Sequence, residues 1–213
     1  MSEEKQYVPP KSFARLADDE RHRLLLEVRA SRPQGEPVWV FGFGSLMWRP
    51  EGKYDVIAPA YLKGYERQFR IWSLRGRGSP ENPGLGLCLE DCAGGCHGLA
   101  YRLIEEHLDE SFDLLWKREM GSGVYKPTWV SVDVEGHGRV PALTFVINRA
   151  HQNYTGPMPI EVMAKHMCDA YGENGRNRDY LASTVEELRK LNKPDPFLEE
   201  LLSLVEARCG KRD

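Results

Sequence analysis

The sequence predicts an α+β fold: a small, mostly antiparallel β-barrel with flanking helices. Between residues 38 and 147, short apolar runs rich in β-branched and aromatic residues alternate with turn residues, and one helical pattern interrupts them. Further helical patterns follow toward the end of the chain. Because strands and helices do not alternate as βαβ units, a doubly wound parallel sheet is disfavoured. A barrel-like antiparallel sheet covered by helices fits best.

The first expected element is a helix over residues 12–31, where apolar residues recur near a helical period and an acidic stretch marks the solvent face. It ends before a Ser-Arg-Pro segment and Gly35. A chain of 213 residues suits one domain with an appendage. We therefore expect residues 1–36 to form an N-terminal helical arm and residues 37–213 to form the domain.

The remaining elements are bounded by clusters of turn-forming residues, with a loop over residues 76–86. The expected strands are 38–43, a strand pair within 60–72, a hairpin of 87–90 with 96–103 turning at 91–95, and a hairpin of 129–134 with 139–147. The expected helices are one that begins near Glu106 and ends before Gly121, then 160–171, 177–191 and 195–208.

Charge and composition narrow the classes of function. The formal net charge is −3, and a chain without a basic excess is not typical of a dedicated nucleic-acid binder. The first residues lack the apolar run of a signal peptide, and charges interrupt every apolar run before it reaches the length of a membrane span. We expect a cytoplasmic protein without a membrane partner. The oligomeric state is not predicted.

The five cysteines allow three interpretations. In a cytoplasmic protein, an odd number of cysteines predicts buried thiols rather than disulfides. Residues 88–97 read Cys-x3-Cys-x3-Cys-His, but the stretch lacks the second ligand pair of a zinc site, so no metal is expected. A nucleophile pair of Cys96 or Cys168 with His166 has no supporting motif.

Four arginines lie close together with aromatic residues between them: Arg67, Arg70, Arg75 and Arg77. Such interleaving occurs in proteins that bind single-stranded nucleic acid. Alternation along a strand, with arginines on one face and aromatic residues on the other, explains the pattern better. An arginine such as Arg75 could then bind a substrate carboxylate through two hydrogen bonds.

Two glycines end the apolar run of residues 38–43, in the order Phe41-Gly-Phe-Gly-Ser-Leu. Glycine lets a backbone approach a ligand closely. The N–H groups of Gly44, Ser45 and Leu46 would then form a concave donor cluster for a carboxylate or an oxyanion. An ordinary β-turn is the alternative. The pattern is not a dinucleotide fingerprint, because no third glycine follows.

Glu119 lies at the C-terminal end of the helix that stops before Gly121. The helix dipole disfavours a carboxylate at this end, and apolar surroundings would raise the pKa of the carboxyl group. A raised pKa suits a carboxylate base that works near neutral pH. The alternative is a solvated glutamate that pairs with Lys117 or Arg118.

Six segments spread over residues 38–190 match one known pattern in order and spacing. They are VFGFGSLMWRP (40–50), GYERQF (64–69), RGSPENPG (77–84), CHGLAYRL (96–103), WKREM (116–120) and GENGRNRDYL (172–181). Together they resemble the ChaC family of glutathione-specific γ-glutamylcyclotransferases. The resemblance implies the fold of that family for residues 37–213. It also implies cleavage of glutathione to 5-oxoproline and Cys-Gly, with no metal and no organic cofactor.

The resemblance also implies roles for single residues. Glu119 would act as general base and then as general acid while the α-amine of the γ-glutamyl unit attacks its own γ-carbonyl. The expected substrate-binding residues are Val40, Phe41, Gly42, Phe43, Gly44, Ser45, Leu46, Arg75, Tyr125 and Tyr180. The only expected partner is the small-molecule substrate, not a nucleic acid or a membrane.

Phe43 departs from the family pattern, which usually has a tyrosine there, so this chain lacks one hydroxyl group. Two alternatives stay open. One is a non-catalytic regulatory module that binds a γ-glutamyl or amino-acid ligand in the same pocket. The other is a cyclotransferase that acts on other γ-glutamyl compounds.

Overall fold

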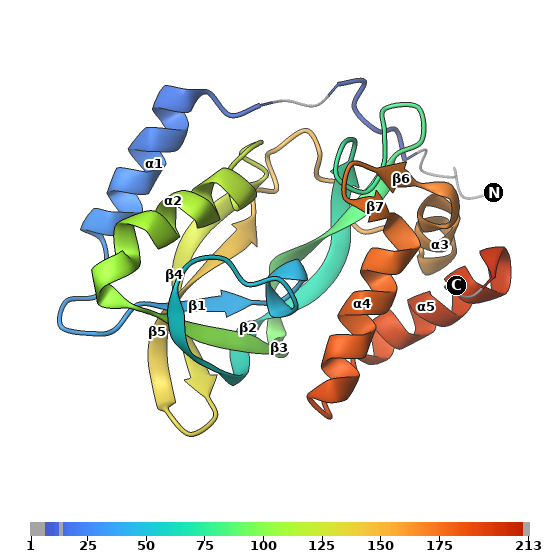
Figure 1. The fold of residues 1–213 in the computed structure, drawn as a ribbon. Coiled ribbons are helices and arrows are strands. Elements are labelled where there is room, and N and C mark those ends of the chain that lie inside the picture. Colours follow the sequence, from blue (N-terminus) through green and yellow to red (C-terminus); the bar gives the residue numbers. More distant parts are fainter. Residues whose placement is uncertain (1–6, 13–14, 211–213) are drawn as a thin grey trace.

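The computed structural model describes residues 7–12 and 15–210, and five strands close into a barrel (Figure 1). Neighbouring strands follow the order β1-β3-β2-β4-β5. Most pairs are antiparallel, whereas β1 and β3 pair in parallel with β5 and complete the closure. The predicted α+β barrel is confirmed. Its strands are β1 (Trp39–Gly42), β2 (Tyr54–Ser73), β3 (Gly84–Leu103), β4 (Tyr125–Val134) and β5 (Gly138–Ile147).

β2 and β3 are each one long strand, where the sequence predicted a strand pair and a hairpin. They pair with each other along almost their whole length. At the expected hairpin tip the register shifts, because Lys63 faces Gly95 whereas Tyr65 faces Asp91. The extra residues of β3 form a bulge opposite Gly64, whose φ of 88° favours glycine. The predicted hairpin was wrong because its glycine-rich turn chemistry marks a bulge in a continuous ladder.

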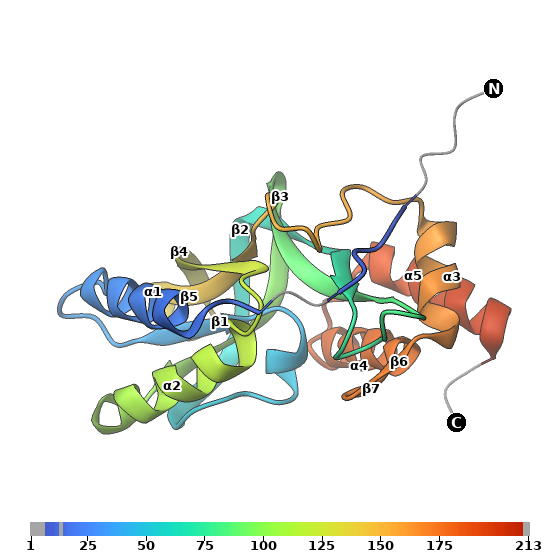
Figure 2. The ribbon, with the colours of Figure 1, turned by 90° about the horizontal axis from the view of Figure 1, so that it is seen from above.

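Helices flank the barrel in two groups on opposite sides (Figures 1 and 2). On one side α1 packs against α2 and β4, and on the other α3, α4 and α5 pack against one another, with α3 and α4 also on β3. The helices are α1 (Asp18–Ala30), α2 (Leu108–Glu119), α3 (Ile160–Asp169), α4 (Asn177–Lys190) and α5 (Pro196–Cys209).

Four of these helices agree with the sequence patterns, whereas α1 is shorter than the expected 12–31. It begins at Asp18, and residues 13–14 of the expected segment lie outside the described residues. Across residues 7–12 and 15–210, no helix has the length and apolar character needed to cross a membrane. The cytoplasmic location stays a prediction.

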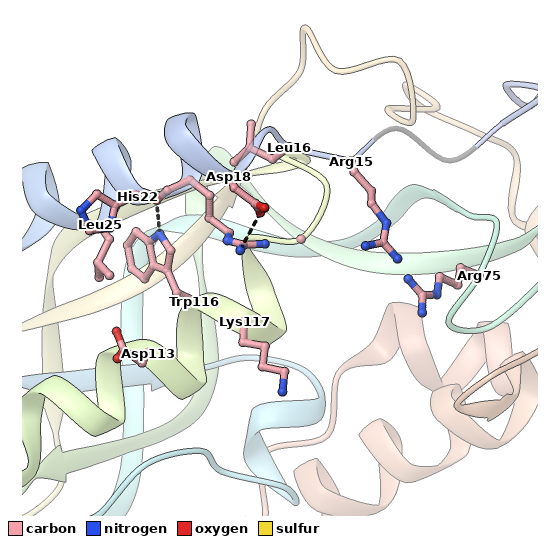
Figure 3. A pocket seen from close by; sticks show the side chains of 11 residues that line it. Arg15, Leu16, Asp18, His22, Leu25, Arg75, Asp113, Trp116 and Lys117 are labelled. Carbon is pink, nitrogen blue, oxygen red and sulfur yellow. Dashed lines mark hydrogen bonds and ion pairs between the residues drawn. The ribbon is translucent and has the colours of Figure 1, made fainter.

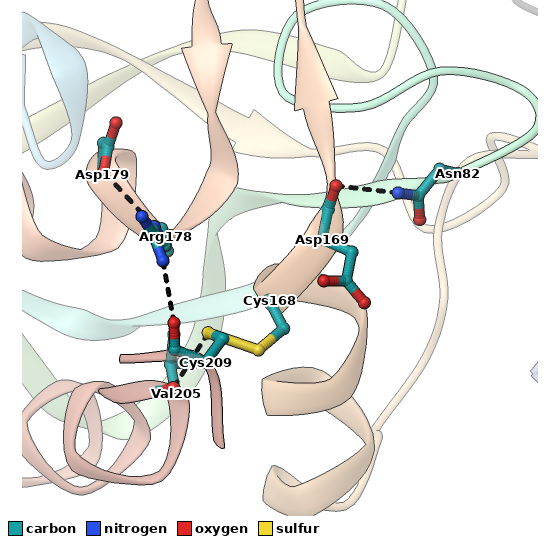
Figure 4. The surroundings of a disulfide bond; sticks show 7 residues. All are labelled: Asn82, Cys168, Asp169, Arg178, Asp179, Val205 and Cys209. Carbon is teal, nitrogen blue, oxygen red and sulfur yellow. Dashed lines mark hydrogen bonds and ion pairs between the residues drawn. A yellow bond between two sulfur atoms is a disulfide. The ribbon is translucent and has the colours of Figure 1, made fainter. Parts of the chain in front are cut away.

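A disulfide joins the ends of two C-terminal helices (Figure 4). Cys168 in α3 and Cys209 in α5 are 41 residues apart in the sequence, and their Cα atoms are 5.7 Å apart. They meet because α3 and α5 pack along each other. The predicted thiols were therefore wrong for this pair. The sequence pattern does not contain this pairing, because it arises only from the packing of the two helices.

Two buried clusters hold the barrel and its helices together. One lies between the barrel and the C-terminal helices and includes Phe41 and Phe69. The other lies beneath α1 and α2 and includes Val40, Leu115 and Trp116. Because successive strand residues point to opposite faces, β1 is buried on both sides. The end of β1 therefore has a fixed position relative to α2.

Candidate active site

The chain leaves β1 through a tight turn that requires glycine at two positions. After Gly42, residues 45–47 form a single 3-10 turn, η1 (Ser45–Met47). A Cβ atom on Gly42 would lie 2.9 Å from Cβ of Leu46, and one on Gly44 would lie 2.9 Å from the Tyr180 hydroxyl. The turn therefore packs directly against the side chain of Tyr180. The first N–H groups of such a turn have no acceptor within it.

Glu119 is the last residue of α2, and its side chain is only 15% exposed. Burial raises the pKa of its carboxyl group; the positive charge of Arg118 opposes this effect, and the negative charge of Glu51 adds to it. The ion pair with Arg118 exists, with 3.2 Å between Nε and Oε1. The alternative predicted from the sequence was a solvated glutamate paired with Lys117 or Arg118. The pairing with Arg118 is present, but the carboxyl group is buried rather than solvated.

Arg118 connects Glu119 to the turn after β1. Its Nη2 donates a hydrogen bond to the Ser45 hydroxyl at 2.8 Å, and its Nη1 lies 3.0 Å from a carboxylate oxygen of Glu51. Nη1 also donates to the backbone carbonyl of Arg49. The sequence alone did not predict a role for Arg118 in the site. One guanidinium group thus fixes the end of α2 against the glycine turn.

Two tyrosines from distant parts of the chain approach the same place. The Tyr125 hydroxyl donates to the Leu87 carbonyl at 2.7 Å, and the Arg77 guanidinium lies 4.9 Å from the centre of the Tyr180 ring. Burial raises the pKa of Tyr180 to about 12, and the charge of Glu119 adds to the effect. Burial also raises the pKa of Tyr125 well above its ordinary value. Both hydroxyl groups stay protonated donors at neutral pH.

A cavity of about 330 Å³ lies where these elements meet. Ser45, Tyr125 and Tyr180 line it, and all three were expected at the site from the sequence. Arg118 and Glu51 line it as well, and neither was expected. Arg118 could have drawn attention because it neighbours Glu119, but its hydrogen bonds to residues 45–51 depend on the folded chain. Two more cavity residues, Arg49 and Arg77, provide positive charge.

The remaining expected residues do not line this cavity, and Glu119 reaches it only through Arg118, its ion-pair partner. Val40, Phe41, Phe43 and Leu46 are buried in the two core clusters, where they support the turn. Arg75 lines a different, larger cavity (Figure 3). It forms an ion pair with Glu173 at 2.8 Å. The sequence predicted Arg75 and Arg77 on one face of a strand. Both residues follow the end of β2 and lie in the loop after it.

The structure does not favour a thiol nucleophile or a metal site built from the cysteines. Burial raises the pKa of the Cys88 thiol to about 12 and also raises that of Cys96. Cys168 is bonded to Cys209, so it is not a thiol partner for His166. Among the residues that the structure describes, no three His, Cys, Asp or Glu side chains gather closely enough to hold a metal ion. The buried carboxyl of Glu119 is the clearest candidate for proton transfer.

Known proteins resemble this chain over most of its length. A glutathione-specific γ-glutamylcyclotransferase of Escherichia coli (strain K12) is 39% identical over 184 residues, which cover 86% of this chain and 79% of that protein. The human glutathione-specific γ-glutamylcyclotransferase 1 is 32% identical over 181 residues, covering 83% of this chain and 81% of that protein.

Solved structures and family patterns agree with these relatives. The crystal structure of a selenomethionine-labelled γ-glutamylcyclotransferase specific to glutathione from yeast has a TM-score of 0.72 and 22% identity, covering 81% of this chain and 97% of that one. At this identity the likeness concerns the fold. The pattern described as ChaC-like protein matches residues 38–208, which include the glycine turn, all of α2 and both tyrosines. Matched over most of its length, this chain belongs to the ChaC-like protein family.

Proposed function

We propose that this protein cleaves glutathione to 5-oxoproline and Cys-Gly, as the names of its bacterial and human relatives indicate for those proteins. The observation that carries the proposal is the buried carboxyl group of Glu119, with its raised pKa, which pairs with Arg118, and Arg118 lines a cavity of about 330 Å³. A pocket of this size suits a small molecule. The proposed partner is this substrate alone, in a cytoplasmic setting.

The reaction needs no second molecule. The α-amine of the γ-glutamyl unit attacks the γ-carbonyl carbon, a five-membered lactam closes, and the amide bond to Cys-Gly breaks. Nucleophile and electrophile belong to one substrate, so holding it in a folded conformation supplies most of the proximity advantage. No water is consumed, and no free glutamate is formed.

Glu119 moves the proton in this scheme. An α-amine has a pKa near about 8, so much of the substrate carries a proton that must leave before attack. The carboxylate of Glu119 accepts a proton from the amine and later returns one to the leaving nitrogen. Because burial raises the pKa of this carboxyl group, Glu119 accepts a proton near neutral pH more readily than a solvated glutamate would.

The developing negative charge requires donors beside the carbonyl oxygen. We assign this role to the N–H groups of the turn at Gly44, Ser45 and Leu46, of which Ser45 lines the cavity, with the Tyr180 hydroxyl as a further donor, since that of Tyr125 already donates to the Leu87 carbonyl. Val40, Phe41, Gly42 and Phe43 precede this turn and are buried, so they fix its position in the fold.

The ends of the substrate carry carboxylates that need cationic partners. Arg49 and Arg77 line the cavity and are suited to hold them. Arg75 does not line this cavity, so we give it no contact with the substrate. The buried carboxyl favours catalysis over a non-catalytic binding module, which has no need of a group with this pKa.

The test is to incubate the purified chain with glutathione and to quantify products by mass spectrometry. We expect 5-oxoproline and Cys-Gly in equal amounts, and no glutamate. A panel of γ-glutamyl dipeptides and a γ-glutamylamine measured in parallel decides between glutathione and other γ-glutamyl compounds. Glutathione that stays intact, although it binds, would support the regulatory module instead. Release of glutamate would indicate hydrolysis and contradict the lactam route.

A further inference from the structure

A second cavity, of about 730 Å³, lies where the segment before α1, α1 itself and the end of α2 meet (Figure 3). It has more than twice the volume of the cavity near Glu119. Its apolar wall is made by Leu16, Leu25 and Trp116. The indole N–H of Trp116 donates to the Arg21 carbonyl at 2.9 Å, and the Leu16 N–H donates to the Gly121 carbonyl at 3.1 Å. These bonds fix the walls relative to one another.

Positive charge predominates on the lining. Arg15, Arg21, Arg75 and Lys117 face two acidic residues, and part of this charge is already paired. Arg21 pairs with Asp18 at 2.8 Å. Arg75 pairs with an acidic residue outside the lining. Asp113, the other acidic residue, lies 3.4 Å from Arg29.

Two lining cations are left without an ionic partner among the described residues: Arg15 and Lys117. Figure 3 shows their side chains, with that of Arg75, on the same side of the cavity. α2 ends here, so its dipole presents negative potential and would oppose a bound anion. Attraction for an anion must therefore come from these side chains.

We propose that this cavity binds a small organic or inorganic anion with two or more negative charges, carried by carboxylate or phosphate groups. Guanidinium groups bind both kinds of oxygen through paired hydrogen bonds, and an ammonium group adds a compact positive charge. Arg15 and Lys117 supply the uncompensated charge, and Arg75 adds a third donor group at the rim. The volume is within the range of pockets for metabolite-sized ligands.

Occupancy would have a structural consequence at the end of α2. Arg15 precedes α1, whereas Lys117 belongs to α2, so one anion that contacts both draws the two segments together. Leu16 is already hydrogen-bonded to Gly121, which follows Glu119 by two residues. The bound anion would therefore hold the segment before α1 against the turn after α2.

The test is isothermal titration calorimetry on the whole chain, with pyrophosphate and citrate as separate probes at constant ionic strength. We expect saturable one-site binding of at least one probe, and the difference between the probes identifies phosphate or carboxylate as the preferred chemistry. The double variant Arg15→Met with Lys117→Met should bind at least about tenfold more weakly, since two charged hydrogen-bonding groups are lost. Both side chains are exposed, so folding should survive, and a thermal melt checks this.

The matched control is Lys165→Met with Arg208→Met, which removes the same two residue types from exposed positions on α3 and α5. This control should bind as the wild type does. The proposal is overturned if neither probe binds, if the cavity double variant binds as tightly as the wild type, or if the control loses affinity equally. Hydrogen exchange gives a second readout: slower exchange at the Leu16 amide with bound probe supports the site, and unchanged exchange there contradicts it.

Discussion

Two cavities meet the same helix, and they differ in the property that matters for chemistry. The smaller one is lined by two buried tyrosines and by Arg118, the ion-pair partner of the buried Glu119 carboxyl group, whose pKa is raised. The larger one has twice the space but presents cations that stay close to water. Volume alone would therefore direct attention to the wrong place. Desolvated titratable groups distinguish the site of proton transfer from a site suited to binding alone.

The helix separates the two sites because successive residues point about 100° apart. Lys117 lines the larger cavity, and Arg118 lines the smaller one. Arg118 is held by Ser45 and Glu51, whereas Lys117 has no ionic partner among the described residues. These two neighbouring charged residues thus line different cavities. Substituting one of them therefore changes one cavity and leaves the lining of the other intact.

After Glu119→Gln itself, the largest loss of turnover is expected from Gly44→Ala. Its new Cβ would meet the Tyr180 hydroxyl at 2.9 Å, so the turn or the tyrosine must shift. A displacement on the order of 1 Å in a catalytic site costs roughly 10²-fold in rate, and we expect a loss of that size in glutathione turnover. Gly94→Ala is the control, because its Cβ would meet only Cys92 at an ordinary 3.5 Å. Equal turnover in both variants would contradict a close fit at the turn.

Tyr180→Phe should have a smaller effect. It keeps the ring that packs near Phe69 and Arg77 and removes only the hydroxyl group. The loss of one hydrogen bond to a developing charge corresponds to about a tenfold decrease in kcat. The comparison variant is Tyr171→Phe, at an exposed tyrosine, which should turn over glutathione like the wild type. A Tyr180→Phe enzyme with unchanged kcat would remove this hydroxyl from the mechanism.

Glu119→Gln should also change stability in a pH-dependent way. The pKa of Glu119 is higher in the folded protein than the ordinary value of 4.5. Between these two pKa values the folded state keeps a proton that the unfolded state has lost, so the wild type loses stability as the pH rises. Glutamine does not titrate. The variant should therefore gain stability relative to the wild type as the pH rises above the ordinary value of 4.5.

Urea unfolding at several pH values measures this difference, with the exposed Glu200→Gln as a control that should show no trend. A Glu119→Gln advantage that shrinks as the pH rises would mean that the ion pair with Arg118 outweighs burial. The raised pKa would then be wrong, and the contrast between the two cavities would lose its main support.

The smallest effect is expected at the other cavity. Lys117→Met lies two residues before Glu119 but lines only the larger cavity. We expect glutathione turnover within about twofold of the wild type, as for other exposed substitutions away from the reacting groups. Steady-state kinetics without added phosphate or citrate makes the comparison. A large loss of kcat in Lys117→Met would show that the two cavities do not act separately.

Much of the fold could be predicted from local patterns. The apolar run of β1, the hairpin of β4 with β5 and the helical period of α2 each depend on residues close in sequence. The long strands β2 and β3 were harder, because glycine has the same signature in a turn and in a bulge. Which of the two forms depends on a partner strand that local sequence does not identify.

The site was predictable only in part for the same reason. The glycines at 42 and 44 suggested a turn that approaches a ligand, and the family resemblance pointed to Glu119. The bonds from Arg118 to Ser45 and Glu51 join residues more than 60 positions apart, and only the folded chain brings them together. Arg75 and Arg77 show the converse, since neighbours in sequence line different cavities.

The rate of 5-oxoproline formation by Glu119→Gln beside the wild type tests the central claim most directly. Glutamine keeps the size of the side chain and removes the group that carries the proton. We predict a properly folded variant whose turnover falls by about 10²-fold or more, the usual scale for a lost general acid and base. Turnover equal to that of the wild type would show that the buried carboxyl at the end of α2 does not take part in the reaction.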